Sequence, residues 1–339
     1  MNLEGKNILV TGGAGFAGSA LVRELLKERA NVIIYDNFAS GDLSNLSDIM
    51  NEIKIVWGDI IDPAFKDVLL RNQVEFVFHL AAEPYIPKCY EFPRKFFEVN
   101  ATGTLNVLLA CKDANVQRIL YYSSSEVYGT ATKIPMDETH PTLPLSTYSA
   151  SKLAADRLCF TLFHEQKIPV IILRQFNMYG PRETQPYIIP ELITQLIQSD
   201  KLKLGNIKAR RDFTYVEDAA KGAISLIKEK KAEGEVFNMG TGKDWSVEEL
   251  ANIIGKLLGK ESVKIDIDPN RLRPLDVAVL NCDSSKIRKF IGWMPTTKLE
   301  DGLQKTIDWY VSNGKRWVWE IKIASENEIW KLKNQKNSN

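Results

Sequence analysis

The chain has 339 residues, of which 44% are hydrophobic and 26% are charged, and its 44 Lys and Arg residues nearly balance 43 Asp and Glu residues. This composition is typical of a folded protein and excludes extensive disorder, which requires few apolar residues or a strong net charge. A net charge of +1 gives no electrostatic basis for binding nucleic acid or a membrane surface, and no apolar run approaches the ~18 residues of a membrane-spanning helix. We therefore expect a soluble, cytoplasmic protein that binds neither nucleic acid nor membrane.

The first half of the chain alternates short apolar runs with amphipathic segments. Strands are predicted over 7–11, 31–35, 53–57, 76–80, 119–123 and 170–173, and helices over 19–29, 65–71, 104–114 and 149–165. Runs such as 31–35 (NVIIY) are apolar throughout, which is typical of parallel strands that are covered on both faces. The alternation predicts an α/β fold with a doubly wound, mostly parallel sheet.

The pattern becomes looser after about residue 180, where Pro181, Pro186 and Pro190 interrupt it. Strands are predicted there over 213–216 and 236–240, and helices over 247–258 and 299–310. This arrangement predicts a smaller α/β lobe interleaved with the main sheet. We divide the chain into a main domain over 1–178, to which 213–240 returns, a lobe over 179–212 and 241–312, and a C-terminal extension over 313–339 with no assigned role.

Cysteine and histidine residues are few and scattered. Cys89, Cys111, Cys159 and Cys282 form no CxxC pair, and none lies near a histidine at metal-ligand spacing. The sequence therefore predicts reduced, mostly buried thiols and no metal site.

Three glycines follow the first predicted strand and open the first predicted helix. Gly12, Gly15 and Gly18 allow a tight turn and a close approach of the backbone to a diphosphate, to which a helix N-terminus offers free N–H groups. Asp36 follows the second predicted strand, where its carboxylate can accept hydrogen bonds from the ribose hydroxyls of adenosine and would repel the additional phosphate of NADP. This order of strand, glycines, helix, strand and acid predicts binding of NAD.

Four motifs together resemble the extended short-chain dehydrogenase/reductase family. They are TGGAGFAG at 11–18, HLAA at 79–82, SSS at 123–125 and YSASK at 148–152. Within this family the chain is similar to the NAD-dependent epimerases and dehydratases that act on nucleotide sugars. The resemblance covers roughly residues 5–310 and implies a Rossmann-type NAD-binding domain followed by a nucleotide-sugar-binding lobe. It also implies a homodimer, in which the helices over 104–114 and 149–165 form a four-helix bundle with those of a second subunit.

The YSASK motif places a tyrosine and a lysine four residues apart, on one face of a helix. Lys152 is expected beside Tyr148, where its positive charge lowers the pKa of the phenol from about 10 and makes a phenolate available as a base. That base would take the proton of a sugar hydroxyl while C4 gives its hydride to NAD⁺, and Ser124 would hold the same sugar oxygen. Taken alone, such a pair more often belongs to a solvated helix face; the glycine motif and the serine run favour catalysis.

The resemblance implies further contacts. Cofactor contacts are implied at Phe16, Asn37, Asp59, Ile60, Leu80, Ala81 and Ala82, in addition to Gly12, Gly15, Gly18, Asp36, Tyr148 and Lys152. Substrate contacts are implied at Glu83, Ser124, Asn177, Arg211 and Arg273. The two arginines would hold the diphosphate through the planar fork of donors that arginine offers, although an ion pair at the surface is the alternative for each.

Glu126 decides between the reactions of this family. The 4-epimerases usually carry a small residue at this position, whereas the 4,6-dehydratases carry glutamate. Oxidation at C4 acidifies the C5 proton, which a carboxylate can remove; the C6 hydroxyl then leaves as water and hydride returns to C6. We therefore predict a 4,6-dehydratase in which Tyr148 is the C4 base, Glu126 is the C5 base, and Ser125 or Glu126 assists loss of the C6 hydroxyl.

Other readings remain open. UDP-glucuronate decarboxylases also carry SEVYG, which stands at 125–129 here, so a decarboxylase or a 4-epimerase is the alternative. Glu126 is otherwise a structural carboxylate that caps a neighbouring backbone group. A non-catalytic NAD-binding protein is disfavoured by the intact set of Ser124, Tyr148 and Lys152. The nucleotide of the substrate, whether UDP, GDP or dTDP, is open as well.

Overall fold

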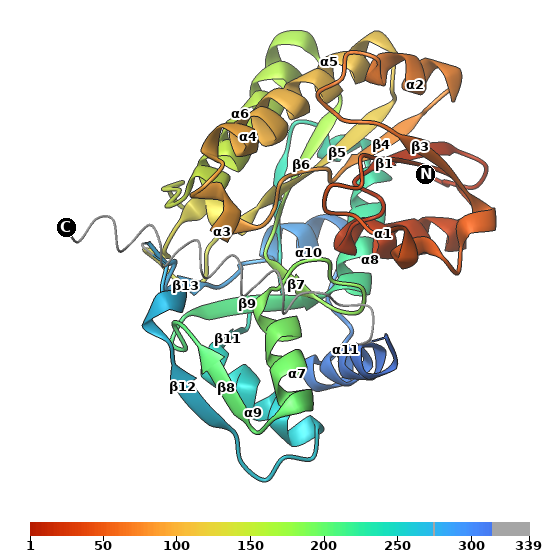
Figure 1. The fold of residues 1–339 in the computed structure, drawn as a ribbon. Helices are drawn as coiled ribbons and strands as arrows, with labels where there is room; N and C mark the ends of the chain where they lie inside the picture. Colours follow the sequence, from red (N-terminus) through yellow and green to blue (C-terminus); the bar gives the residue numbers. More distant parts are fainter. Residues whose placement is uncertain (274, 314–339) are drawn as a thin grey trace.

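The computed structural model describes residues 1–273 and 275–313, so that almost all of the predicted extension over 313–339 lies outside the described residues. Its main sheet has seven parallel strands in the order β10-β6-β5-β4-β1-β2-β3 (Figure 1). These strands are β1 (Asn7–Thr11), β2 (Asn31–Asp36), β3 (Ile53–Trp57), β4 (Phe76–His79), β5 (Arg118–Ser124), β6 (Val170–Gln175) and β10 (Val236–Met239). The predicted doubly wound α/β fold is confirmed.

Helices cover both faces of this sheet. One face is covered by α1 (Phe16–Lys27), α8 (Val216–Ile227) and α10 (Ser285–Ile291), and the other by α2 (Phe65–Arg71), α5 (Thr104–Asp113) and α6 (Thr147–Gln166). The short helices α3 (Ile86–Cys89) and α4 (Pro93–Phe97) precede α5. None of the helices in the described ranges is long and apolar enough to cross a membrane.

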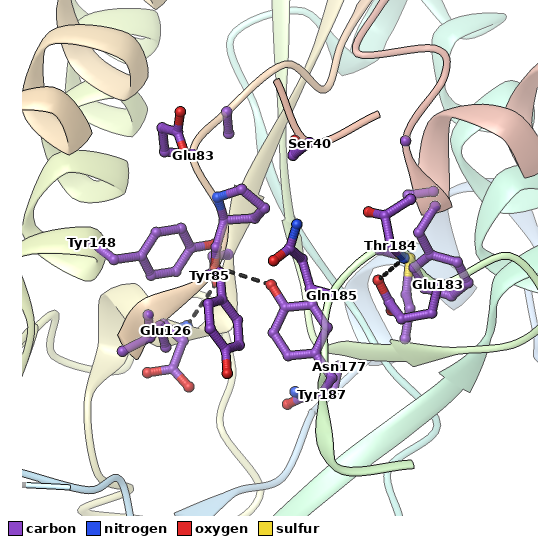
Figure 2. Close-up of a pocket in the computed structure, with 18 of the residues that line it drawn as sticks. Ser40, Glu83, Tyr85, Glu126, Tyr148, Asn177, Glu183, Thr184, Gln185 and Tyr187 are labelled. Atoms are coloured by element: carbon purple, nitrogen blue, oxygen red, sulfur yellow. Dashed lines mark hydrogen bonds between the residues drawn. The ribbon is translucent and has the colours of Figure 1, made fainter. Parts of the chain in front are cut away.

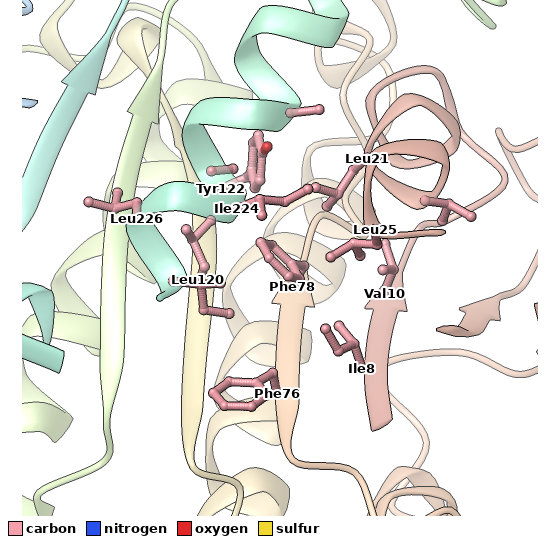
Figure 3. Packing of buried hydrophobic residues seen from close by; sticks show 14 of the residues in the cluster. Ile8, Val10, Leu21, Leu25, Phe76, Phe78, Leu120, Tyr122, Ile224 and Leu226 are labelled. Carbon is pink, nitrogen blue, oxygen red and sulfur yellow. The ribbon is translucent and has the colours of Figure 1, made fainter. Parts of the chain in front are cut away.

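The main domain has two hydrophobic cores, one on each face of the sheet, because successive side chains of a strand point to opposite faces. Ile8 and Val10 of β1 pack with Leu21 and Leu25 of α1, whereas Leu9 belongs to the core on the opposite face (Figure 3). Because both faces are buried, the strands read as continuous apolar runs, as the sequence predicted. The four cysteines are buried and free, which confirms that prediction too.

The lobe is built around a four-stranded sheet and a two-stranded sheet. The strands are β7 (Asn177–Tyr179), β9 (Arg210–Tyr215), β11 (Asp244–Ser246) and β13 (Val279–Leu280), and the pair β8 (Lys201–Leu204) and β12 (Lys264–Ile267). The helices α7 (Ile188–Gln198), α9 (Val247–Leu257) and α11 (Leu299–Asn313) share one hydrophobic core with them.

Two boundaries of the predicted division need correction. Residues 213–215 were expected in the main domain, but they belong to β9, which pairs with β7, β11 and β13 of the lobe sheet. Conversely α10 lies inside the range expected for the lobe, yet Ile287 packs into the core of the main sheet. An apolar run predicts a strand, but its partner strand is set by contacts far away in the sequence, so the pattern alone does not assign it to a sheet.

Helix α7 was not expected, because Pro181 and Pro186 precede it and Pro190 lies within it. Pro190 lies in the first turn of this helix, where the backbone N–H groups have no partner within the helix, so a residue that lacks an N–H is tolerated. The apolar residues Ile189, Leu192, Ile193 and Leu196 then recur at helical spacing and are buried in the lobe. The helix therefore begins two residues before the proline that was expected to break it.

Candidate active site

A cavity of about 490 Å³ lies where the main-domain strands end, between their carboxyl ends and the lobe. In a doubly wound sheet this edge is where ligands bind, because the loops that follow neighbouring strands diverge there. All the residues that the sequence assigned to a site line this one cavity, as follows: Gly12, Gly15, Phe16, Gly18, Asp36, Asn37, Asp59, Ile60, Leu80, Ala81, Ala82, Glu83, Ser124, Ser125, Glu126, Tyr148, Lys152, Asn177, Arg211 and Arg273.

The turn between β1 and α1 requires glycine at two positions. Gly12 has a φ of +71°, and a Cβ there would lie 2.9 Å from the backbone nitrogen of Ala81. A Cβ on Gly18 would collide with the carbonyl oxygen of Gly12. Gly15 is the N-cap of α1 and has no side chain to occupy the N–H groups of the first turn. The turn thus leaves the positive end of α1 open to the cavity, which suits a diphosphate.

The acidic end of the cavity joins three loops. The carboxylate of Asp36 accepts hydrogen bonds from the backbone nitrogens of Ala14 at 2.9 Å and Phe38 at 2.8 Å. Burial raises the pKa of this carboxyl, and the two hydrogen bonds oppose that rise. Next to it, Nδ2 of Asn37 donates to Oδ2 of Asp59 at 2.8 Å. Together with the glycine turn, these residues fit the adenosine diphosphate half of a dinucleotide such as NAD.

Strand β5 and helix α6 bring the proposed catalytic groups together. Ser124 ends β5, and its Oγ accepts a hydrogen bond from the backbone nitrogen of Glu126 at 3.2 Å. Tyr148 lies in the first turn of α6, which Ser146 and Ser149 close with a reciprocal capping box. Burial raises the pKa of Tyr148 to about 12; a hydrogen bond with Ser124 opposes the rise, and the nearby carboxylate of Glu126 adds to it. The phenol, a hydroxyl and a carboxylate therefore meet at one place.

Lys152 lies one helical turn after Tyr148 on α6 and contacts β5. Its ammonium donates to the carbonyl oxygen of Tyr122 at 2.6 Å and lies 4.4 Å from the ring centre of Tyr121. Burial lowers the pKa of Lys152 to about 7, although the nearby thiol of Cys159 and the carboxylate of Asp156 oppose that fall. The spacing places both residues on one face of α6 and both line the cavity, so an effect of Lys152 on the pKa of Tyr148 stays a prediction.

The two predicted arginines share one carboxylate. Arg211, on β9, donates to the carbonyl oxygen of Val277 at 2.7 Å and lies 3.4 Å from Oδ1 of Asp276. Arg273 lies 3.9 Å from the same oxygen. Burial lowers the pKa of Arg211, whereas the carboxylates of Glu126 and Asp276 favour its charged form. The lobe thus brings a guanidinium within electrostatic range of Glu126, and two cations line the same end of the cavity.

Several lining residues escaped the sequence analysis. Tyr187, from the lobe, donates to the carbonyl oxygen of Pro84 at 3.0 Å, and its ring packs edge-on against Tyr85 with centres 5.8 Å apart (Figure 2). These tyrosines meet across the cavity from segments a hundred residues apart in the chain. The Oδ1 atom of Asn177 is buried and has no hydrogen-bond partner among the described residues. Of the segment that carries Tyr85, only Glu83 was predicted from the sequence, and Tyr187 lies in the proline-rich stretch that no motif marks.

Glu183 is a buried carboxyl that lines this cavity, and its raised pKa predicts how the stability of the protein depends on pH. Burial raises its pKa from 4.5 to about 8, while hydrogen bonds from the backbone nitrogens of Thr184 and Gln185 oppose that rise. The folded chain therefore binds more protons than the unfolded chain between pH 4.5 and about 8, and stability falls as the pH rises through that window. Glu183→Gln removes this loss.

We expect the stability of Glu183→Gln relative to the unchanged protein to grow by on the order of 5 kcal/mol between about pH 4 and about pH 9, at about 1.4 kcal/mol for each unit between the two pKa values. Urea unfolding at both pH values measures it, with the exposed Glu98→Gln as a matched control. An equal difference at both pH values would show that Glu183 ionises freely in the folded chain.

Comparisons with known proteins agree with this geometry. A sequence model of the GDP-mannose 4,6 dehydratase family matches residues 9–306. Human dTDP-D-glucose 4,6-dehydratase is 32% identical over 325 residues, with 92% of both chains covered. UDP-N-acetyl-alpha-D-glucosaminuronate decarboxylase of Bacillus cytotoxicus is 34% identical over 318 residues, with 90% of this chain and 98% of the relative covered.

Among solved structures, DesIV from Streptomyces venezuelae, a dTDP-glucose 4,6-dehydratase determined with NAD bound, superposes with a TM-score of 0.85. It is 30% identical, and the match covers 92% of this chain and 99% of that structure. The family match spans both the main sheet and the lobe, so it extends to every wall of the cavity. The chain therefore belongs to the GDP-mannose 4,6 dehydratase family, within the extended short-chain dehydrogenases/reductases that include nucleotide-sugar dehydratases and epimerases.

Proposed function

We propose that this protein is an NAD-dependent nucleotide-sugar 4,6-dehydratase. The observation that carries the proposal is the carboxylate of Glu126, which lies close enough to Tyr148 to raise the pKa of that phenol. A reaction that only inverts C4 needs no second base, whereas elimination of water across C5 and C6 needs a group that removes the C5 proton. The family relatives support a dehydratase without excluding the other reactions of this fold.

The residues around the glycine turn would hold the cofactor. Gly12, Gly15 and Gly18 leave room for the diphosphate, and Asp36 favours the unphosphorylated ribose of NAD over that of NADP. When bound, NAD supplies the acceptor and donor of hydride. Lys152 lines the inner wall of the same cavity, where its ammonium is held by the carbonyl of Tyr122.

Each proton transfer of the reaction would then be carried out by a different side chain or pair of side chains. Tyr148 takes the proton of the sugar C4 hydroxyl, and Ser124, which hydrogen-bonds with it, holds the same oxygen. Glu126 takes the C5 proton once C4 is a ketone, and Glu126 or Ser125 returns a proton to the departing C6 hydroxyl. Arg211 and Arg273 bind the diphosphate of the substrate and keep the sugar at this end of the cavity.

Mass spectrometry after incubation with UDP-, GDP- and dTDP-sugars tests the proposal. We expect one substrate to lose the mass of one water without any added cofactor, since a retained cofactor returns to its starting state after each turnover. An unchanged mass with a new sugar stereoisomer would instead identify a 4-epimerase. Loss of carbon dioxide from a uronic acid substrate would identify a decarboxylase, and either outcome would overturn the dehydratase.

Exposed apolar side chains on α4, α5 and α6 support a homodimer, which is part of this proposal. Leu109 of α5 and Phe160 of α6 are 39% and 38% exposed, and Phe97 of α4 is exposed as well. Large apolar side chains on neighbouring helix faces are typical of subunit interfaces. We therefore propose that α5 and α6 of two subunits pack together as a four-helix bundle.

Phe160→Asp is expected to convert the dimer to monomers at micromolar concentration, because it buries a carboxylate in an apolar interface. Phe290→Asp on α10 is the matched control, since Phe290 is 37% exposed on the opposite face of the sheet and should leave the dimer intact. Sedimentation velocity distinguishes the species. A monomeric unchanged protein, or a variant that stays dimeric, would contradict this interface.

A further inference from the structure

A buried ion pair lies behind the proposed catalytic groups without lining the cavity. The guanidinium of Arg174 on β6 contacts the carboxylate of Asp156 on α6 through two hydrogen bonds, Nε to Oδ2 at 2.9 Å and Nη2 to Oδ1 at 3.0 Å. Asp156 is 0% exposed and Arg174 is 3% exposed. Neither side chain is among the residues that line the cavity. A pair buried this deeply contributes little net stability, so another reason for its presence is needed.

The ion pair contacts each chain segment that carries a proposed catalytic group. Asp156 itself lies on α6, two turns after Tyr148 on the same face of the helix. Oγ of Ser123, the neighbour of Ser124 at the end of β5, donates to Oδ2 of Asp156 at 2.9 Å. These two contacts fix α6 against the end of β5.

The third segment is the short turn that carries Glu126. Nη1 of Arg174 donates to the hydroxyl of Tyr128 at 3.0 Å, and that hydroxyl donates to Oδ1 of Asn238 at 2.7 Å. Tyr128 ends the turn of Ser125–Tyr128 and is fully buried. Only one residue separates Tyr128 from Glu126, so the position of this hydroxyl constrains where the carboxylate points.

Both partners of the pair stay charged. Burial alone would raise the pKa of Asp156, but the hydrogen bonds and positive charge of Arg174, with a further contribution from Arg157, hold that pKa below its usual value. Hydrogen bonds between charged partners are stronger and more directional than neutral ones, and bidentate geometry fixes their orientation. The pair is therefore a rigid junction between α6, β5 and the Ser125–Tyr128 turn.

We infer that Asp156 and Arg174 are positioning residues, which hold Tyr148, Ser124 and Glu126 at the mutual distances that turnover requires. The inference rests on the proposed dehydratase function for its kinetic readout. It predicts that loss of the pair changes the chemical step rather than substrate or cofactor binding, because small displacements of reacting groups lower the rate much more than the affinity.

The test compares Asp156→Asn with the double variant Asp156→Asn/Arg174→Gln. The single variant leaves a buried guanidinium without its counter-charge and is expected to be strongly destabilised. The double variant removes both charges, so its thermal midpoint should recover toward that of the unchanged protein. We expect its kcat to remain at least about tenfold low, with KM and bound NAD unchanged. The control is Asp218→Asn, a buried carboxylate that binds the backbone nitrogens of Thr296 and Thr297 outside the cavity.

Recovery of kcat together with stability in the double variant would overturn the inference, because it would show that the pair acts on folding alone. If the single variant does not fold, Tyr128→Phe, which removes only the hydroxyl that links Arg174 to the turn, is expected to lower kcat with KM unchanged; an unchanged kcat overturns the inference.

Hydrogen–deuterium exchange over 123–129 and 147–152 separates this inference from the proposed function. We expect faster exchange in both segments in the double variant and no change there in Asp218→Asn. If the unchanged protein turns over no nucleotide sugar, the proposed function fails. The positioning of the two segments by the ion pair is then tested by hydrogen–deuterium exchange alone. Unchanged exchange in both segments overturns it.

Discussion

Glu126→Gln is expected to retain NAD and to lose elimination of water by about 10²–10⁴-fold, the usual contribution of a general base. The amide keeps the size of the side chain and cannot accept the C5 proton. The residues proposed to hold the adenosine diphosphate half of the cofactor lie on the loops after β1, β2 and β3, so retention of NAD is not expected to depend on Glu126. The rate of mass loss from the substrate measures the effect.

Exchange of the C5 proton with deuterated solvent reports the same step separately. We expect the unchanged protein to incorporate deuterium at C5 and Glu126→Gln to incorporate almost none. Glu91→Gln is the control, because Glu91 is exposed and does not line the cavity. Full turnover by Glu126→Gln would contradict the prediction and show that Glu126 has only a structural role in the Ser125–Tyr128 turn.

Tyr148→Phe is expected to lower kcat by about 10²–10⁴-fold with little change in substrate affinity. The variant loses one oxygen, while its ring can keep its edge-on contact with Phe96, whose centre lies 6.4 Å away. The hydroxyl is the atom that hydrogen-bonds with Ser124, so its loss removes the proposed base and one contact to the sugar oxygen.

The pH dependence provides a sharper test of the same residue. Burial holds the pKa of Tyr148 at about 12, so the fraction of phenolate rises with pH throughout the neutral range. We expect kcat/KM of the unchanged protein to rise between about pH 6 and about pH 9, because this quantity reports the ionisation of the free enzyme. The residual activity of Tyr148→Phe should lack that rise. A pH profile that is the same in both proteins would assign the base to another group.

Local patterns predicted the main domain closely. The strand Asn7–Thr11 and the helix Phe65–Arg71 have the bounds that were expected, because their apolar residues recur with the period of the element that buries them. The glycine turn followed from backbone sterics, which act within a few residues. The cavity itself followed from topology, since the carboxyl ends of parallel strands meet at one edge of the sheet.

Contacts between distant segments were not predictable in the same way. The ammonium of Lys152 binds a carbonyl thirty residues earlier in the chain, and no spacing rule on α6 indicates that partner. The hydroxyl of Tyr187 and the carbonyl of Pro84 meet only once the lobe is folded against the main domain. The ion pair of Asp156 and Arg174 could not be predicted from the sequence either, because a charged residue in a helix or strand is more often exposed than buried.

The most direct measurement follows the hydrogen at C4. The nucleotide sugar that the protein turns over is prepared with deuterium at C4, and the product is analysed by mass spectrometry and NMR. The proposed function predicts loss of one water and deuterium on the C6 methyl group, since the hydrogen removed from C4 is returned to C6. Deuterium found at C4 of a product of unchanged mass would contradict the dehydratase and make this protein a 4-epimerase.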